Sequence, residues 1–476
     1  MSLESPALAL TPSSDPQPAL AMPPRPRRPL STWQLLRTFP DNAVAACDEE
    51  LFEELFVERR FVWGRLFVIS DPDGIHRILQ ANIDNYIRIP PVRRAFTFTS
   101  GGGMNHLEGE QWWRHRRTIN PALDYRALLP GLPELIRLTE EMSAHLCALP
   151  PGQEFEIGRT LTHLLTRTTG HVFAGDDRRI DALLLRLGRY PENYGPLDVL
   201  PLPRWLHFLD RYRRARSGLN EHYALLDELF AERRNENYAG GNDLMRRMAT
   251  ACDRETGQAL SAAELRDEVL TLAAGAQAPL RAMTWAWYLL AQFPDVEERL
   301  HAELDAVLGG RSPTPEDFSR LVYLRRFIDE TMRLYPPLPV MLRTAVADDE
   351  IGGRRVPRGS FIAIMPWVVH RHRKLWADPE RFDPERFNPG RIASGQAGAR
   401  SRYAYIPFGV GPRVCVAASL AMAEIQIAIA VLAQRLRFRL VPGQTVEPTA
   451  WSTLRPRQDI RMTVERRTPD GKAAPC

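Results

Sequence analysis

Apolar residues recur at helical spacing along most of this chain. The pattern covers residues 130–250, with an interruption at the proline-containing loop 191–203. It returns in an Ala-, Leu- and Ile-rich run that ends near Arg435. Because a repeat near 3.6 residues places apolar side chains on one face of a helix, these segments are predicted to be helices that cover a core.

The longest single helix is predicted over residues 261–292, about 45 Å at about 1.5 Å per residue. Ser261 and Glu264 form a Ser-x-x-Glu capping box, which marks a helix start. Pro279 has no N–H for the carbonyl of Gly275, so a kink with a free oxygen is expected there. The small residues around the kink would let a flat ligand approach the backbone, although a tightly packed core helix with a proline kink has the same pattern.

Alternating apolar and polar positions predict only short strands. A hairpin is expected over residues 61–69 around Gly64, and antiparallel strands over residues 343–367, which turn at two glycine-containing pairs. Asp71 and Asp73 are predicted helix caps. Shorter helices are expected at 49–58, at 74–81 and from Gly109 onward. The fold class is therefore mainly α with a small β region.

The composition is that of an ordinary folded protein. The chain has 476 residues, of which 44% are hydrophobic and 25% charged. A net charge of +4 is small for this length and gives no indication of nucleic-acid binding. The five cysteines are scattered and lack a Cys-x-x-Cys pair, so neither a disulfide framework nor a zinc site is predicted. A reducing, cytoplasmic location fits this cysteine usage.

The ends of the chain differ from its middle. Residues 1–30 are rich in Pro, Ser and Ala and are predicted to be disordered. Their apolar pieces are shorter than the roughly 18–20 residues of a membrane helix, and no basic segment precedes an apolar one. We expect no signal peptide, no contact with a membrane, a single domain over residues 31–466 and a flexible tail over 467–476.

A cysteine in a stiff loop is the strongest candidate for chemistry. Residues 408–417 read Phe-Gly-Val-Gly-Pro-Arg-Val-Cys-Val-Ala, and a helix begins just after them. Cys415 follows Arg413 by two residues. Because a nearby arginine and a helix N-terminus both favour a thiolate, Cys415 is predicted to be a site for a thiolate.

Two further pairs of residues have the spacing of helix neighbours. Trp112 and Arg116 share one helical face, and an indole N–H beside a guanidinium suits a buried carboxylate or phosphate. A solvated basic face with an incidental tryptophan has the same pattern. Glu330 and Arg333 lie one turn apart among apolar residues, which suggests a buried pair. Such a pair needs more hydrogen-bonding partners, and Arg386 is the candidate.

With these segments assembled, the chain resembles a cytochrome P-450, the haem-thiolate monooxygenase family of bacterial soluble type, over roughly residues 40–465. The cysteine loop is similar to the family pattern Phe-x-x-Gly-x-Arg-x-Cys-x-Gly. The matching residues are Phe408, Gly411, Arg413 and Cys415, while Ala417 replaces the last glycine.

The other motifs resemble the family in the same order along the chain. Glu330 and Arg333 match its Glu-x-x-Arg helix, and Arg386 matches the arginine that completes its buried triad. Trp112 and Arg116 match the Trp-x-x-x-Arg of the helix that holds a haem propionate. Four such matches with family-like separations are very unlikely to arise by chance.

The resemblance implies one haem b (iron protoporphyrin IX), with the Cys415 thiolate as the ligand of its iron. Charge-assisted bonds from arginine and tryptophan would hold the two propionates of this buried cofactor. One of these arginines follows Arg333 by ten residues, as in relatives. The implied cofactor-binding residues besides Cys415 are Phe408, Trp112, Arg116, Arg343 and Arg413.

The chain departs from the family in the middle of the long helix. Most relatives read Ala-Gly-x-Glu/Asp-Thr there, and the acid and alcohol help deliver protons to dioxygen. This chain has Ala274-Gly275-Ala276-Gln277-Ala278. Gln277 can hydrogen-bond a water but is no acid near neutral pH, and Ala278 can do neither. Gly275, Gln277 and Ala278 are nevertheless the candidate catalytic positions.

Three explanations remain open for the missing pair. The substrate or an ordered water, held by Gln277 and the Gly275 carbonyl, carries the protons. Alternatively, the reaction is an oxidative coupling, a desaturation or a ring formation on a natural-product scaffold. A peroxide-driven or isomerase-like reaction is the third, but peroxide-using relatives carry an Arg-Pro pair here, and Pro279 and Arg281 are out of that register.

The resemblance implies oxidation of a small apolar or aromatic molecule, in secondary metabolism, with dioxygen. From the family's architecture, the substrate pocket is expected between residues 90–105, 274–279, 337–342 and 451–453. Electrons would come from a ferredoxin with its reductase or from a flavodoxin-type donor, because no flavin or iron–sulfur domain is recognised in the sequence.

The remaining expectations concern partners. Arg114 and Arg117 could dock an acidic redox partner, or they are exposed arginines without a role. The protein is expected to be a monomer. A non-catalytic haem-thiolate ligand sensor is the alternative from another functional class, although the sequence shows no second domain or tail for signalling.

Overall fold

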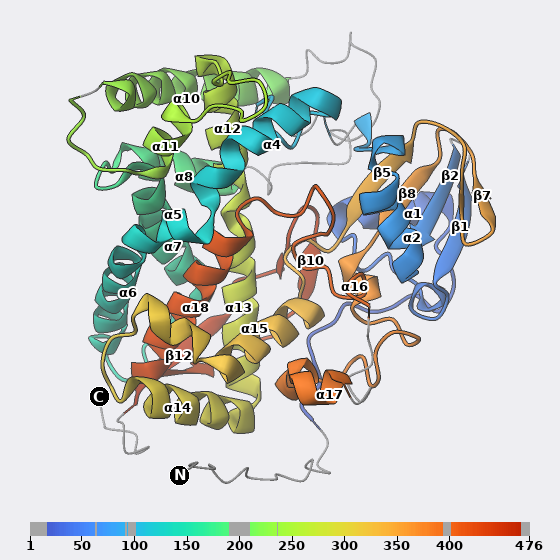
Figure 1. Ribbon diagram of the computed structural model, residues 1–476. Coiled ribbons are helices and arrows are strands. Elements are labelled where there is room, and N and C mark those ends of the chain that lie inside the picture. Colours follow the sequence, from blue (N-terminus) through green and yellow to red (C-terminus); the bar gives the residue numbers. More distant parts are fainter. Residues whose placement is uncertain are drawn as a thin grey trace, which may run out of the picture.

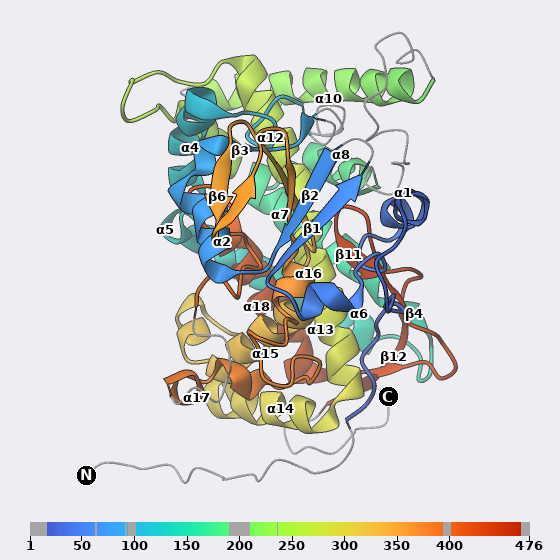
Figure 2. The same ribbon diagram turned by 90° about the vertical axis from the view of Figure 1, so that its right-hand side faces the viewer.

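The structure is a computed structural model that describes residues 17–61, 64–90, 93, 101–189, 210–235, 237–393 and 401–467. A large helical part lies beside a smaller region of sheet (Figure 1). Figure 2 shows the sheet in front and the helices behind it. The predicted fold class, mainly α with a small β region, is confirmed.

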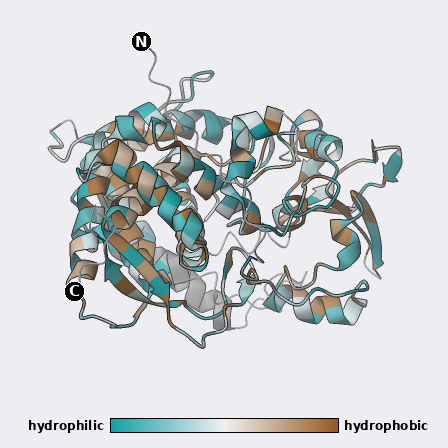
Figure 3. Ribbon diagram, turned by 90° about the horizontal axis from the view of Figure 1, so that it is seen from below, coloured by the Kyte–Doolittle hydropathy of each residue, from teal (hydrophilic) through white to brown (hydrophobic). Residues whose placement is uncertain are grey.

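Long helices form the helical part and enclose two hydrophobic clusters. They carry hydrophobic and hydrophilic residues along the same helix, as expected of elements that cover a core (Figure 3). The longer helices are α4 (Gly109–Leu123), α6 (Leu132–Cys147), α7 (Ile157–Ala174), α8 (Arg179–Arg189), α10 (Asp210–Arg234), α12 (Ala262–Gly275), α13 (Gln277–Gln292), α14 (Pro294–Leu308), α15 (Val322–Leu334) and α18 (Ala418–Arg435). The shorter ones are α1 (Thr32–Asp41), α2 (Pro72–His76), α5 (Tyr125–Leu128), α11 (Leu244–Thr250), α16 (Pro366–Val369) and α17 (Pro389–Ala393).

The predicted helix over residues 261–292 is present in two pieces, α12 and α13. Ser261 Oγ accepts from the Glu264 N–H, and the Glu264 carboxylate accepts from the Ser261 N–H, so the capping box is confirmed. The pieces meet at Ala276, whose N–H donates to the Ala273 carbonyl at 3.2 Å. Pro279 then occupies the third position of α13, where a helical N–H has no intrahelical partner, so the proline costs no hydrogen bond. The predicted kink is therefore a break.

A five-stranded sheet forms most of the β region, in the order β1-β2-β8-β5-β3. Only β2 and β8 run parallel, and the other neighbours are antiparallel. Its strands are β1 (Phe56–Phe61), β2 (Gly64–Ile69), β3 (Tyr86–Ile87), β5 (Met341–Ala345) and β8 (Phe361–Ile364). The smaller sheets contain β6 (Asp349–Ile351) with β7 (Arg354–Val356), β10 (Pro448–Ala450) with β11 (Leu454–Pro456), and β4 (Phe155–Glu156), β12 (Arg461–Arg466) and β9 (Leu436–Leu440).

Two local predictions near the first hairpin were wrong. The helix expected over residues 49–58 is a single 3-10 turn over Glu49–Phe52, and β1 begins at Phe56. The physical reason is that Val57 pairs with Val68 across the hairpin and both side chains are buried. In the following helix Asp71 is the cap, since its carboxylate accepts from the Gly74 N–H, whereas Asp73 lies inside the first turn.

The chain packs against the domain earlier than residue 31. The carbonyl of Ala21 accepts from the Tyr335 hydroxyl at 3.0 Å, and Arg25 pairs with Glu380 at 2.7 Å. Residues 1–16 and 468–476, within the segments predicted to be disordered or flexible, lie outside the described residues. Within the described ranges, α18 has the length and apolarity of a membrane span, but 78% of it is buried, as in a core helix.

Candidate active site

The cysteine loop lies between the β region and α18, and two glycines shape it. Gly409 and Gly411 have φ of 72° and 76°, which favours glycine. A Cβ on Gly411 would lie 2.1 Å from the carbonyl oxygen of Leu79, so only glycine lets the loop pack this closely. The Cys415 N–H donates to the Phe408 carbonyl at 2.9 Å, which closes the loop just before α18.

The Cys415 side chain is accessible although protein groups surround it. It is exposed, yet protein surrounds it closely enough that burial raises the pKa of its thiol. An accessible thiol whose pKa is nevertheless raised by burial is expected where a side chain lines a space enclosed by protein. The Ala417 N–H and the charge of Arg116 oppose the shift by favouring the thiolate. Gly275, in the break between α12 and α13, is also exposed, and a Cβ there would meet nothing within 4 Å.

Arg343 is buried, and the partly buried Arg88 and Arg413 lie close to it near this loop. Burial and then the charges of Arg343 and Arg413 lower the pKa of Arg88 to about 9. Burial and then the charge of Arg413 lower that of Arg343 to about 10. Glu108 contacts two of the three, by an ion pair to Arg413 and by accepting from the Arg88 backbone N–H at 3.1 Å. Since arginine retains its proton in proteins, this surplus positive charge calls for a bound anion.

The structure brings most of the predicted cofactor residues together. Trp112 is buried, and the guanidinium of Arg413 lies 4.3 Å above its ring. Burial lowers the pKa of Arg116, which is near Cys415. A planar cofactor that carries two negative charges and binds a thiolate ligand fits these residues. Their direct contacts to it remain predictions. Arg88 was missed because no sequence spacing connects it with the motifs.

The two arginines proposed to dock a redox partner have acidic partners within the protein. Arg114 pairs with Glu264. Arg117 pairs with Asp253 at 2.8 Å and with two further glutamates. Their charges are thus largely neutralised, which weakens the case for a docking role and also shows that they are not idle exposed arginines.

The Glu330–Arg333 pair is buried, as predicted. Both side chains are inaccessible, and their closest N–O distance is 2.6 Å. Arg333 makes five hydrogen bonds, two to Glu330 and three to the carbonyls of His370, Pro379 and Arg381, which uses all five of its N–H donors. Arg386 Nε lies 3.5 Å from the Glu330 carboxylate.

This network reaches the cysteine loop through two residues that the motifs did not indicate. His370 Nδ1 lies 3.2 Å from the Arg333 carbonyl, and its Nε2 accepts from the Ile406 N–H at 2.9 Å. Burial lowers the pKa of His370 to about 3, so the ring is neutral. The Tyr405 hydroxyl donates to the Asp329 carbonyl at 2.9 Å. These hydrogen bonds therefore hold the backbone at residues 405 and 406, just before Phe408.

The predicted substrate-pocket segments are partly described. The Leu454 N–H donates to the Pro337 carbonyl at 3.0 Å and joins the segments 337–342 and 451–453. Much of the segment 90–105 lies outside the described residues. Its end packs on α12, where the Met104 N–H donates to Glu268 at 2.8 Å.

Comparisons with known proteins agree with this fold and site. The sequence model for the cytochrome P-450 family matches residues 24–464. Cyclooctat-9-en-7-ol 5-monooxygenase of Streptomyces melanosporofaciens is 34% identical over 73% of this chain and 74% of its own length. Pentalenene oxygenase of Streptomyces avermitilis is 32% identical over 54% of this chain and 56% of its own. The crystal structure of the cytochrome P450DA heme domain, 22% identical, superposes with a TM-score of 0.79 over 96% of this chain and 100% of that one.

The fold and the family match together define an oxidoreductase that binds haem b. The chain belongs to the cytochrome P-450 family and is a monooxygenase, which takes small-molecule substrates and electrons from a separate redox partner. This rules out the non-catalytic ligand sensor as its class.

Replacing Arg88 or Arg343 with glutamine should weaken haem retention. A hydrogen bond to a charged group contributes about 1.5–3 kcal/mol, so haem transfer to apomyoglobin should accelerate about tenfold or more. Arg60→Gln is the matched control, because the Arg60 side chain is 73% exposed. If the Arg88 variant loses haem as slowly as the Arg60 variant, Arg88 does not contact a propionate.

Proposed function

We propose that this protein oxidises a small, apolar, ring-containing terpene, with Cys415 as the thiolate ligand of its haem. The observation that carries the proposal is the accessible Cys415 thiol, which a glycine-shaped loop holds near Arg116. The names of the two relatives, an oxygenase of pentalenene and one of cyclooctat-9-en-7-ol, support the substrate class.

Each part of the site has a separate task in this proposal. The haem, when bound, activates dioxygen, and a thiolate ligand favours O–O cleavage. Trp112, Arg116, Arg343 and Arg413, with Arg88 added by its position, hold the propionates. Phe408 packs against the larger hydrophobic cluster and supports the loop.

The experiment combines a spectrum with a binding screen. The reduced protein treated with carbon monoxide should show the strongly red-shifted Soret band of a thiolate-bound haem. Pentalenene and related cyclic hydrocarbons should then shift the Soret band of the oxidised protein, while polar compounds of similar size should not. A normal Soret band with no response to any terpene would reject the substrate class and leave the haem site intact.

Atypical oxidation is the second candidate, and the residues at the helix break favour it. Gln277 and Ala278 replace the acid and alcohol that support ordinary hydroxylation in relatives. Mass spectrometry separates the possibilities, because hydroxylation adds one oxygen atom whereas desaturation, ring formation or coupling removes hydrogen. We further propose a monomer in the cytoplasm, a domain over residues 31–466, and a ferredoxin with its reductase or a flavodoxin as the electron donor.

Replacing Gln277 with leucine should lower, several-fold, the fraction of reductant recovered in product with pentalenene. Gln277 accepts from Arg281 at 3.3 Å and lines a cavity that threonine and arginine side chains also line, so its amide can hold a water near the break. Ala278→Thr is the matched control, since Ala278 does not line that cavity and little gain is expected. A clear gain in the Ala278→Thr protein would place the proton route at residue 278 instead.

A further inference from the structure

One face of α7 lines a cavity with polar side chains. Arg159, Thr162, Thr166 and Thr169 are spaced three, four and three residues apart, so they share that face. The cavity has a volume of about 330 Å³, which lies within the range of about 300–1,000 Å³ that is usual for small-molecule sites. Because Arg159 is exposed, the cavity opens to solvent at this end.

Another wall of the cavity belongs to α13. Gln277, Arg281 and Thr284 are spaced four and three residues apart and line the cavity along one helical face. Ala276, at the break between α12 and α13, lies at the inner end, and β11 contributes Arg455. The apolar lining residues are Leu165, Leu184, Leu185, Leu280 and Pro456. The cavity therefore combines charged and polar groups with an apolar surface that suits a carbon skeleton.

The charges that line the cavity are mainly positive. Among the described residues, the guanidiniums of Arg159 and Arg455 have no acidic partner, and that of Arg455 donates only to the Pro456 carbonyl, at 3.4 Å. Asp459 is the one acid among the described lining residues, and its carboxylate accepts from the N–H groups of Gly158 and Arg159 at 2.8 Å and 2.9 Å. Since arginine retains its proton in proteins, the cavity favours a bound anion.

The threonine hydroxyls of the cavity are already used as donors. Thr162, Thr166 and Thr284 each donate to a carbonyl one turn earlier in the same helix, at 2.7–2.8 Å. Thr169 donates to the Glu424 carboxylate at 2.7 Å. Because a hydroxyl has a single proton, these bonds leave the threonine oxygens as acceptors. A ligand that fits them brings donors of its own, such as hydroxyl groups.

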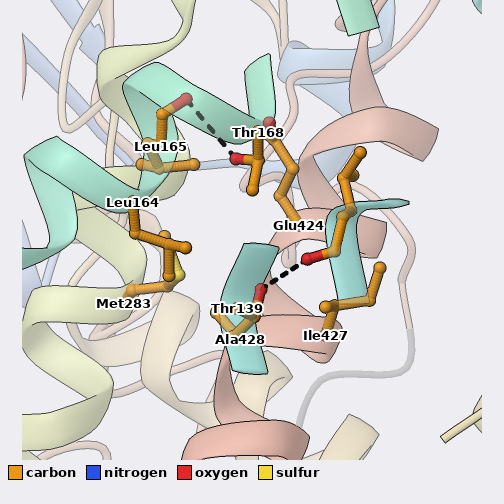
Figure 4. A pocket seen from close by; sticks show the side chains of 9 residues that line it. Thr139, Leu164, Leu165, Thr168, Met283, Glu424, Ile427 and Ala428 are labelled. Carbon is orange, nitrogen blue, oxygen red and sulfur yellow. Dashed lines mark hydrogen bonds between the residues drawn. The ribbon is translucent and has the colours of Figure 1, made fainter. Parts of the chain in front are cut away.

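A neighbouring space, between α6, α7, α13 and α18, provides a contrast (Figure 4). It leaves no room for a water molecule, because side chains such as Leu164, Met283 and Ile427 close it. Thr139, which lines this space, donates to the Leu135 carbonyl at 2.7 Å. Its hydroxyl has the same local bonding as those of the cavity but no room for a ligand beside it, so Thr139 is a suitable control.

We propose that the cavity between α7 and α13 binds a small organic anion that carries hydroxyl groups. The guanidiniums of Arg159 and Arg455 pair with the oxyanion. Thr162 and Thr166 accept from the hydroxyl groups of the ligand. Neither Cys415 nor any of the implied haem-binding residues is among the described lining residues, so this is a second site, and it does not rest on the proposed substrate.

Calorimetric titration of the haem-loaded full chain tests the ligand class with four probes. Glycerol 3-phosphate and glycerate carry an oxyanion and hydroxyl groups, inorganic phosphate carries the oxyanion alone, and glycerol carries the hydroxyl groups alone. One of the first two should bind at a single site about tenfold or more tighter than inorganic phosphate, and glycerol should not bind. The tighter of the two identifies the oxyanion as a phosphate ester or a carboxylate. If neither binds more tightly than inorganic phosphate, the proposal is overturned.

Two arginine substitutions test whether the anion lies in this cavity. Arg159→Gln and Arg455→Gln each remove one charge and should weaken binding of the tighter probe about tenfold or more, because charge-assisted hydrogen bonds are the stronger kind. Arg60→Gln removes a charge from a side chain that is 73% exposed on β1, and it should bind like the wild type. If both cavity variants bind as tightly as the Arg60 variant, the anion binds elsewhere and the assignment of the cavity fails.

A threonine substitution separates recognition of the hydroxyl groups from that of the charge. Thr162→Val should weaken binding of the tighter probe several-fold and leave that of inorganic phosphate unchanged. Thr139→Val should change neither. A normal carbon monoxide spectrum and an unchanged melting temperature would show that the fold and the haem site of each variant are intact, so that a loss of binding reports on the cavity alone. Equal affinities in the two threonine variants would reject recognition of the hydroxyl groups by α7.

Discussion

Replacing Cys415 with alanine abolishes the red-shifted Soret band of the reduced, carbon monoxide-treated protein together with product formation. Cys415 is the accessible thiol that follows the two left-handed glycines of the loop and lies near Arg116. Alanine keeps the loop backbone, including the hydrogen bond from residue 415 to Phe408, but removes the sulfur. The expected loss of activity is complete, because no other ligand of this type lies in the loop.

The control for this substitution is another exposed cysteine. Cys252→Ala also removes an exposed thiol, and it lies in a separate segment before α12. This variant should retain the band and the activity. A band that survives Cys415→Ala, or one that disappears in Cys252→Ala, would contradict the assignment of Cys415 as the haem ligand.

Replacing Arg333 with leucine should lower the free energy of unfolding by about 3–5 kcal/mol and prevent haem loading. The change removes five hydrogen bonds at once and leaves the inaccessible Glu330 carboxylate without its main partner. Because the Arg333 side chain also donates to the carbonyl of His370, whose ring accepts from the Ile406 N–H, the backbone support of the cysteine loop is expected to weaken as well. Urea unfolding followed by circular dichroism, with the haem content measured in parallel, gives both values.

The same helix offers a matched surface pair. Arg325 contacts Asp329 at 2.9 Å, but its side chain is 50% exposed. Arg325→Ala should therefore change the free energy of unfolding by less than about 1 kcal/mol and leave haem loading normal. If the Arg325 and Arg333 variants lost similar amounts of unfolding free energy, burial would not determine how much the Glu330–Arg333 pair contributes to stability.

Motifs with short internal spacing could be predicted from sequence, and contacts between distant segments could not. The capping box and the burial of Glu330 with Arg333 follow from residues within one or two helical turns, whereas the kink predicted at Pro279 is a break at Ala276. Arg88 and His370 gain their roles only when the folded chain brings remote segments beside them. No periodicity in the sequence indicates such contacts.

Some predictions failed because one pattern fits two structures. Residues 49–58 have a mixed apolar and charged pattern that suits a helix, yet the pairing of Val57 with Val68 places the second half in a strand. Arg114 was interpreted as a free surface cation, but Glu264, the residue of the capping box, neutralises it.

The arginines near the cysteine loop also affect the stability of the chain before it binds haem. Arg88, Arg343 and Arg413 lie close enough to lower one another's pKa values, and Glu108 is the one acid that the described contacts place between them, so binding of a dianionic cofactor is expected to stabilise the chain. Cofactor binding then contributes directly to the folded state's lifetime. A chain that lacks haem is therefore expected to unfold more often than the loaded one.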